Sequence, residues 1–386
     1  RMRVQFAVHL EGADERPRDT TIAVHVCDVQ GAVMAHTSAA AVCTGSGRFV
    51  LDVPLAGAAL WAPNSPVLYT ARATLSGSGV QHTRTITFGM RTFTIRDGRF
   101  CLNGVPYPLR GSNLLMEWYA TPELYEDRGG CLTRLLVDDA RRMHANTFRT
   151  HTMPPSHRAA EICDAGGTLL LAESPLTYNY GVMRFSPAEE ACYRSNAVAM
   201  CTAWVEELAN HPSIIMWVSS NEPVNADEYD QYAWDIGTLI PAIKAVDPTR
   251  PVMRSGEASP DVQDTHCYAG YWGGAAGEFE QFARWRATTR DEHRPIMNSE
   301  YIEGAPPARR FLWSGAEDGT PRWPMIYAMV GMEQTETLRR LGYDGILPYM
   351  YHGWTRGAWR ADAPTPMFAA LRSALAPVAV SLDLAD

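Results

Sequence analysis

The feature of this sequence that most constrains its fold is a regular alternation that begins near residue 105. From there, short apolar or β-branched runs alternate with longer segments of helical periodicity. We expect strands at 106–112, 146–151, 168–173, 214–220, 251–254, 263–268, 295–299 and 345–350. We expect helices at 132–145, 156–165, 187–209, 227–246, 279–290, 333–341 and 365–375. Eight strands that alternate with helices are typical of a closed parallel (β/α)8 barrel.

An open, doubly wound parallel sheet is the alternative fold. That fold ordinarily carries a glycine-rich phosphate loop after its first strand. Here Gly111-Ser112-Asn113 lacks the G-x-G-x-x-G spacing, so we favour the barrel. The segment 301–332, rich in proline, glycine and tryptophan, follows the seventh expected strand. Long loops at the carboxyl ends of barrel strands ordinarily help to form a substrate site.

Residues 1–93 have a different pattern, in which the regular segments are strand-like. Apolar and polar residues alternate over 4–10 and 22–26, and turns rich in glycine and proline separate such segments. Short strands of this kind are typical of a β-sandwich. We therefore predict an all-β sandwich at 1–93, the barrel at 94–376, and a tail or the start of a further domain at 377–386. Since Arg1 opens directly into a strand-like segment, we expect the chain to be part of a longer protein.

The composition argues against several classes of protein. With 46% apolar residues the chain can bury a large core, and with 20% charged residues it is not a largely disordered chain. The formal net charge of −9 disfavours a nucleic-acid binder, which needs a basic face, and disfavours attraction to anionic membranes. No run of about 18 apolar residues is present, so we expect no membrane span. The sequence does not set the compartment; a bacterial cytoplasm, or else a periplasm, is our expectation.

A hydrophobic strand that ends in Asn221-Glu222 carries the first candidate for chemistry. The run Ile214 to Val218 is apolar, and polar residues follow at its carboxyl end, which is the catalytic face of a barrel. An Asn–Glu pair is costly to bury there without a role. We interpret Glu222 as a general acid/base and Asn221 as a substrate-binding residue. The alternative is that Glu222 caps the next helix.

Glu300 is the second candidate, delivered to the end of another apolar strand that begins at Pro295. Carboxylates at the ends of the fourth and seventh strands would converge across the mouth of a barrel. A pair about 5–5.5 Å apart serves retaining glycoside hydrolysis, and a pair about 6.5–9.5 Å apart serves the inverting reaction. In the retaining case we expect burial and the partner's charge to keep the acid protonated, and hydrogen-bond donors to keep the nucleophile ionised.

Several ordered motifs resemble glycoside hydrolase family 2, the family of β-galactosidases, β-glucuronidases and β-mannosidases. They are Phe88-Gly89-Met90-Arg91, Leu102-Asn103-Gly104, Leu109 to Asn113, Asp139 to Thr150, Cys163 to Gly167, His211 to Glu222, Asp247 to Val252, and Pro295 to Tyr301. The resemblance implies an immunoglobulin-like sandwich before a TIM barrel. It also implies hydrolysis with retention, with Glu222 as the acid/base and Glu300 as the nucleophile.

The resemblance implies supporting roles as well. Tyr268 is expected to donate a hydrogen bond to the nucleophile, and Arg149 to pair with it or donate to it. A rim aromatic and a structural salt bridge are the respective alternatives. Trp354 is expected to stack under the reactive sugar ring, with packing beneath a loop as the alternative. Asn113 and Glu173 are expected on the rim, where they could grip sugar hydroxyls.

The chain departs from the family pattern in three places. Many members have Arg-Thr-Ser-His-Tyr-Pro after the second strand, whereas this chain has Arg149-Thr150-His151-Thr152-Met153-Pro154. A shift of one place in a strand turns a side chain to the other face, so we expect His151 to contact a different part of the sugar or none. The Asn-x-Lys motif that recognises a glucuronide is absent, since Lys244 is the only lysine. Candidate substitutes are Arg309, Arg310 and Arg356. The family's amino-terminal jelly-roll domain has no counterpart here.

No cofactor is predicted. Some β-galactosidases of the family use magnesium near the acid/base, but no cluster of carboxylates and histidines near Glu222 requires one. His266 and Glu303 are metal candidates by position only, and ordinary hydrogen bonding is the favoured alternative. The predicted partner is an oligosaccharide or glycoside, with no nucleic acid and no membrane, and a homo-oligomer is compatible with the sequence.

Two hypotheses of different classes follow. The leading one is an exo-acting retaining β-glycosidase, with β-galactosides as the favoured substrates. Within the family, β-glucuronidase, β-galacturonidase and β-mannosidase activities are the alternatives. Outside enzymes, the alternative is a catalytically weak carbohydrate-binding fragment that lacks the walls of the substrate pocket.

Overall fold

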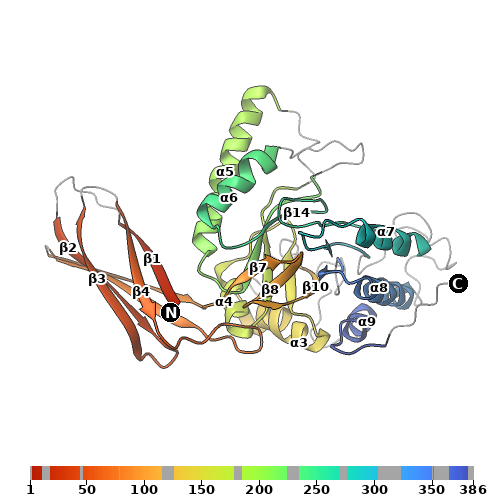
Figure 1. Cartoon of the computed structure of the whole chain (residues 1–386), viewed down its shortest axis with the longest axis horizontal. Coiled ribbons are helices and arrows are strands. Elements are labelled where there is room, and N and C mark those ends of the chain that lie inside the picture. Colours follow the sequence, from red (N-terminus) through yellow and green to blue (C-terminus); the bar gives the residue numbers. More distant parts are fainter. Residues whose placement is uncertain are drawn as a thin grey trace. The chain divides into compact units, whose positions relative to one another are not determined.

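The computed structural model describes residues 2–10, 18–43, 47–77, 79–114, 126–177, 185–223, 234–269, 276–302, 323–349, 351 and 365–380 (Figure 1). The chain separates into two compact units, which we describe one at a time. One consists of Arg1–Arg91 with Asn210–Pro212, and the other of Thr92–Ala209 with Ser213–Asp386. Among the described helices, none combines the length and the apolar character that a bilayer span needs.

The first unit is a sandwich of antiparallel strands. One sheet pairs β1 (Met2–Leu10) with β4 (Gly47–Leu55). The other has the order β3-β2-β5-β6, formed by β3 (Val33–Cys43), β2 (Arg18–Cys27), β5 (Tyr69–Gly77) and β6 (Val80–Phe88). Alternate residues of the two sheets share one apolar core, as Ile22, Val24 and Val26 of β2 and Val53 of β4 show. The sandwich expected from the alternation is confirmed.

The second unit opens with a small antiparallel sheet. It contains β7 (Phe93–Arg96), β8 (Arg99–Leu102) and β9 (Val105–Pro106) in that order. The first barrel strand, β10 (Leu109–Leu114), therefore begins later than the predicted 106–112. Residues 105–106 pair back onto β8 instead of entering the barrel. Prolines at 106 and 108 offer no N–H to a parallel neighbour, which explains the delay.

A curled parallel sheet forms the core of the second unit and confirms the expected TIM barrel. Its order is β14-β13-β12-β11-β10-β16-β15, and all six pairings are parallel. The strands besides β10 are β11 (Thr147–Thr150), β12 (Leu169–Glu173), β13 (Ile214–Asn221), β14 (Val252–Ser255), β15 (Met297–Asn298) and β16 (Gly345–Ile346). Every residue of β11, β12 and β13 is buried, and this accounts for the continuous rather than alternating apolar runs of β12 and β13.

The predicted sixth strand, 263–268, is not a regular strand, and that prediction was wrong in this respect. Isolated parallel bridges from Gln263 to Ile296 and from His266 to Glu300 hold it beside β15. The Asp264 carboxylate accepts hydrogen bonds from the backbone N–H groups of Gly256 and Ser299, at 2.7 and 3.0 Å. A side chain thus takes the place of ladder partners along the seam between β14 and 263–268.

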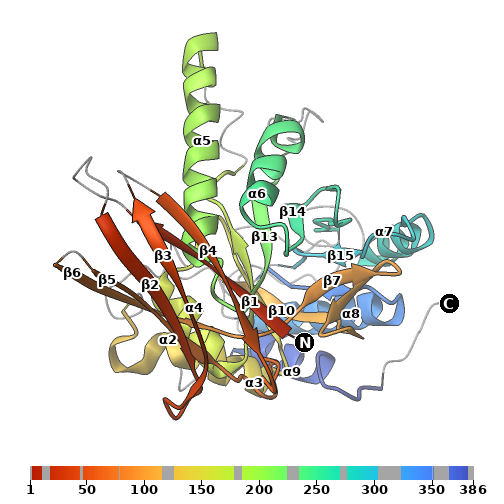
Figure 2. The same ribbon diagram turned by 60° about the vertical axis from the view of Figure 1, so that its left-hand side comes forward.

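Helices follow most of the barrel strands, and most lie near the predicted positions. The exception is α8, which begins at Trp323 instead of 333 and therefore takes up the end of the predicted loop 301–332. Figure 2 shows α8 and α9 side by side, and they are in contact. Side-chain caps begin several helices: the Ser186 hydroxyl accepts from the N–H of Glu189, whose carboxylate accepts from the N–H of Ser186. The helices are η2 (Arg128–Gly130), α2 (Cys131–Thr133), η3 (Arg134–Asp138), α3 (Asp139–Met143), α4 (His157–Gly166), α5 (Pro187–Leu208), η5 (Asp235–Leu239), α6 (Ile240–Val246), α7 (Ala276–Thr288), α8 (Trp323–Arg340) and α9 (Pro366–Ala374).

The predicted domain boundaries at 93 and 376 stay predictions. Residues 377–380 are described and contain no strand, and 381–386 lie outside the described residues. The predicted further domain or tail at 377–386 is therefore neither supported nor excluded.

Candidate active site

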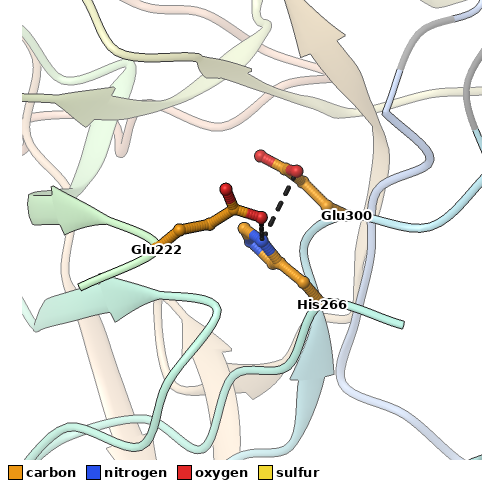
Figure 3. Close-up of side chains that lie close together, drawn as sticks. All are labelled: Glu222, His266 and Glu300. Carbon is orange, nitrogen blue, oxygen red and sulfur yellow. Dashed lines mark hydrogen bonds and ion pairs between the residues drawn. The ribbon is translucent and has the colours of Figure 1, made fainter. Parts of the chain in front are cut away.

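Two glutamates meet at the carboxyl edge of the parallel sheet. Glu222 follows β13 directly, and Glu300 lies two residues beyond β15. Figure 3 shows both side chains pointing toward His266. Glu222 has a left-handed backbone conformation, with φ of 45°, and its N–H donates to the carbonyl of Ser255 at 2.9 Å. Such a conformation is unfavourable for a residue other than glycine, and strain of this kind is concentrated at functional sites.

The separation of the two carboxylates fits one of the two chemical possibilities. The nearest ligand atoms of Glu222, His266 and Glu300 all lie within 4.8 Å of one another. Carboxylates about 5–5.5 Å apart serve a covalent, retaining mechanism, whereas about 6.5–9.5 Å leaves room for the water of an inverting one. The geometry therefore fits retention and does not fit the inverting alternative.

Glu300 is a buried carboxylate surrounded by donors. Arg149 Nη1 donates to its Oε1 at 2.6 Å, and the Tyr268 hydroxyl donates to its Oε2 at 2.7 Å. His151 Nε2 and His266 Nδ1 lie 3.4 Å from Oε1 and Oε2. Burial alone would raise the pKa of Glu300, but the charges of the two histidines and Arg149, with the tyrosine hydrogen bond, hold that pKa at about 2. The group is ionised at neutral pH, as a nucleophile must be.

Arg149 connects Glu300 to the residues behind it. Its guanidinium donates to both oxygens of Glu173, and also to Asn113 Oδ1 at 2.9 Å and to Asn221 Oδ1 at 2.6 Å. Burial lowers the pKa of Arg149, but the charges of Glu173 and Glu300 raise it further, so the guanidinium stays charged. All these partners are fully or almost fully buried. Asn113, Glu173 and Asn221 thus orient Arg149, and their expected contacts with a sugar stay a prediction.

His151 lies beside Glu300, just beyond the end of β11. We expected strand alternation to turn it away from the place of the family histidine. Since β11 ends at Thr150, the alternation no longer applies at His151, and Thr152 turns the chain with φ of 52°. The imidazole packs edge-on against Tyr349, with ring centroids 5.1 Å apart, and faces Glu300. The structure thus places His151 beside Glu300, and its expected contact with a different part of the sugar, or with none, stays a prediction.

Other predicted residues lie outside the described part of the chain. Trp354, the expected sugar platform, is one of them. The others are Glu303, Arg309, Arg310 and Arg356.

His266 is the residue whose place in the site the sequence interpretation missed. Its Nδ1 lies 3.0 Å from Glu222 Oε1, and its Nε2 lies 2.9 Å from Ser255 Oγ and 3.1 Å from Ser299 Oγ. The sequence interpretation had named it only as a metal candidate by position. Its spacing of two from Tyr268 was the available signal, because residues two apart in an extended segment point to the same side.

The same three side chains have the residue types of a metal site. Among the described residues, Glu222, His266 and Glu300 are the group of such side chains close enough together to hold an ion. His266 and Glu300 already have protein hydrogen-bond partners, and magnesium, the metal considered from the sequence, prefers oxygen ligands. We therefore interpret the group as an acid–base cluster.

Comparisons with known proteins agree with this geometry. The profile of the TIM barrel domain of glycosyl hydrolases family 2 matches residues 93–309, and a second profile of glycosyl hydrolases family 2 matches residues 1–91. β-Glucuronidase from Sus scrofa is 28% identical over 327 residues, which are 77% of this chain and 46% of that protein. A β-galactosidase from Leuconostoc mesenteroides is 29% identical over 219 residues, which are 55% of this chain and 20% of that protein.

Solved structures share the fold. Bacteroides uniformis β-glucuronidase 2 superposes with a TM-score of 0.77 at 19% identity, over 97% of this chain and 48% of that one. The chain spans about half the length, or less, of the curated relatives it matches. Because the barrel profile alone covers more than half of this chain, the chain belongs to glycosyl hydrolase family 2.

Proposed function

We propose that this protein is a retaining β-glycosidase that removes terminal β-linked sugars, with Glu300 as the nucleophile and Glu222 as the acid/base. One observation carries the proposal. A buried carboxylate whose pKa is held at about 2 lies within 4.8 Å of a second, partly exposed carboxylate at the edge of a parallel barrel. An ionised and a protonatable carboxyl group at that separation are what double displacement requires.

The first step forms a covalent intermediate. The Glu300 carboxylate attacks the anomeric carbon, and the bond from that carbon to the glycosidic oxygen breaks. Glu222 gives a proton to the departing oxygen. Arg149 and Tyr268, which each donate to a different oxygen of Glu300, hold the carboxylate in one orientation.

The second step releases the sugar. Glu222, now a carboxylate, takes a proton from a water that attacks the anomeric carbon, and Glu300 leaves as a carboxylate. Two inversions at one carbon give net retention. The charge that returns to Glu300 is stabilised by the same donors that lower its pKa.

A neutral sugar, with β-galactosides favoured, is our choice of substrate class. The one lysine of the chain lies on α6, where its Nζ pairs with Asp261 at 2.5 Å and donates to the carbonyl of Arg250. It is therefore engaged in a structural pair, and these 386 residues offer no other lysine to grip a uronic acid. β-Glucuronides are the second candidate, because the relatives that match include proteins named β-glucuronidase as well as β-galactosidase.

A panel of chromogenic β-glycosides tests the proposal. The 386-residue chain is assayed with galactoside, glucuronide, galacturonide and mannoside, and the anomer released first is identified by NMR. We expect hydrolysis with β-anomer formed first, highest kcat/KM on the galactoside, and loss of at least about 10³-fold in Glu300→Gln. Glu161→Gln, which alters a side chain 57% exposed, is the matched control and keeps wild-type activity.

Two results would count against parts of the proposal. Undiminished activity in Glu300→Gln would remove the nucleophile assignment, and an α-anomer as first product would remove retention. Binding of a glycoside without hydrolysis by the wild-type chain would favour the alternative of a carbohydrate-binding fragment.

A further inference from the structure

We propose that His266 is a positioning residue that stores the catalytic proton: in the resting site its imidazolium carries the proton that Glu222 delivers to the leaving group. The proposal rests on the glycosidase function proposed above. It adds a third group to the pair of carboxylates and says where the proton is held between turnovers.

The imidazole lies between the two carboxylates. Nδ1 is 3.0 Å from Glu222 Oε1 and 3.4 Å from Glu300 Oε2, so its hydrogen is closer to the acid/base than to the nucleophile (Figure 3). Nε2 faces the hydroxyl oxygens of Ser255 and Ser299, at 2.9 and 3.1 Å. Both ring nitrogens thus have acceptors, and an imidazolium, which donates from both, satisfies them all.

The charges around the ring favour its protonated form. Burial alone would lower the pKa of His266, but the carboxylates of Glu300, Glu222 and Asp264 raise it. Glu300 and Glu222 come from the neighbouring strand ends, and Asp264 from its own segment, with an oxygen 3.9 Å from Nε2. Burial raises the pKa of Asp264, so the negative charge of this carboxylate stabilises the imidazolium less than the other two carboxylates do. The nearby cation Arg149 directs its guanidinium to Glu300 and Asn221.

The ring is clamped in this place. Gly256 has φ of +87°, and a Cβ built on it would lie 3.1 Å from Nδ1 of the His266 ring. The backbone of Gly256 therefore covers one face of the imidazole. The Gly256 N–H is itself held by Asp264 Oδ2 at 2.7 Å, and Asp264 also accepts from the Ser299 hydroxyl at 2.5 Å. A chain of contacts thus fixes the orientation that aims Nδ1 at Glu222.

Glu222 needs such a neighbour because its own surroundings are open. A general acid must carry a proton at the working pH, and burial is the usual means of holding it on a carboxyl group. The side chain of Glu222 is 37% exposed, whereas that of Glu300 is 4% exposed. Burial of the acid, expected from the sequence, is therefore only partial. An imidazolium at 3.0 Å supplies the proton by another route.

The proton moves in a closed cycle. As the glycosidic bond breaks, its electron pair goes to the leaving oxygen. His266 Nδ1 passes its proton to Glu222, and Glu222 passes it on to that oxygen, so Glu222 ends the step as a carboxylate and His266 as a neutral imidazole. Glu300 becomes a neutral ester, so His266 loses both its proton and its strongest counter-charge and stays neutral. Glu222 then accepts a proton from the attacking water and returns it to Nδ1, as Glu300 regains its negative charge. No proton or electron is gained or lost over the cycle apart from those of water.

His266→Asn tests the proposal, because asparagine can form hydrogen bonds here but cannot carry the proton. The readout is kcat/KM for β-glycosides whose leaving groups range from dinitrophenol, which needs no proton to depart, to an alkyl alcohol, which needs one. We expect a loss on the order of 10²-fold for the alkyl glycoside and less than about 10-fold for the dinitrophenyl glycoside. An equal loss for all leaving groups would overturn the proposal, since it would mean that His266 only supports the structure.

His151→Asn is the matched control. His151 also lies 3.4 Å from Glu300, but it approaches the other oxygen of that carboxylate. The expected loss in this variant is the same for every leaving group, because the change disturbs the contact with Glu300 and leaves proton delivery to the leaving group intact. A steep leaving-group dependence in His151→Asn, matching that of His266→Asn, would remove the specific role of His266.

A second measurement is independent of turnover. With 15N-labelled histidine, NMR reports the protonation of His266, assigned by its absence from His266→Asn. We expect the imidazolium signal to persist well above the ordinary midpoint near pH 6.5, and the midpoint to fall in Glu222→Gln. A midpoint below about 6.5 would overturn the proposal even if the chain is an active glycosidase. Conversely, a raised midpoint in a chain that hydrolyses no glycoside would support a protonated His266 but contradict the proposed glycosidase function.

Discussion

Replacing Arg149 with methionine tests how the site keeps a buried carboxylate ionised. The guanidinium makes five hydrogen bonds, two of them to Glu173 and one to Glu300, and its side chain is 0% exposed. Methionine fills similar space and supplies neither a charge nor a donor. The variant therefore leaves two buried carboxylates without their shared cation.

The cost follows from the burial of the charges. Removing one partner of a buried ion pair costs about 3–5 kcal/mol, because the remaining charge is uncompensated. The cost depends on pH. In the wild type the pKa of Glu300 is lowered to about 2, so this contribution to stability is present above the unfolded value near 4.3 and is lost as the pH falls toward 2. Without Arg149 the pKa of Glu300 rises, and protonation relieves the penalty at lower pH.

Scanning calorimetry at pH 5 and pH 8 measures the effect. A loss of about 3–5 kcal/mol lowers the unfolding temperature by about 10 °C at pH 8, at 2–4 °C per kcal/mol for a large domain. We expect a clearly smaller loss at pH 5. The matched control is Arg158→Met, whose side chain is 54% exposed and whose surface pairs contribute about 0–1 kcal/mol. A loss in Arg149→Met no larger than the control, or one equal at both pH values, would refute the electrostatic reasoning.

Three further outcomes are expected. Tyr268→Phe removes the hydroxyl that donates to Glu300, so we expect kcat/KM to fall about 10- to 100-fold. The pKa of Glu300 should rise, which shifts the acid limb of the kcat/KM profile to higher pH; an acid limb at the wild-type pH would contradict this. Gly256→Ala forces a side chain against the His266 ring at a positive φ, and should lower the unfolding temperature by at least 2 °C together with kcat/KM; wild-type values for both would show that the contact is not tight. Burial raises the pKa of Asp247, but the charge of a neighbouring arginine and hydrogen bonds lower it to about 2, so its contribution is present above about pH 3.9 and is lost toward pH 2. Asp247→Asn should therefore be about 1–2 kcal/mol less stable than wild type at pH 7 and equal to it near pH 2, as urea unfolding can measure; a pH-independent difference would contradict the sign.

Much of the fold could be predicted from periodicity. The continuous apolar runs of β12 and β13 are buried on both faces, and the alternating run of β2 is buried on one. These patterns are local, so a single sequence contains them. The segment 263–268 resembled a strand for the same reason but lacks a regular ladder. Its backbone pairs with 295–300 only through isolated bridges, and toward β14 the Asp264 side chain accepts from the Gly256 N–H, a contact that no local pattern records.

The two glutamates that we propose as the catalytic pair show the same division between local and long-range information. The sequence by itself determined that Glu222 and Glu300 end two barrel strands, because an apolar run followed by an acid is a local signal. Only the tertiary structure decided that they lie within 4.8 Å, that Arg149 is shared among buried partners, and that His266 stands between them. Distances between strand ends depend on the curl of the whole sheet. The charge state of each group depends in turn on neighbours that are far away in the chain.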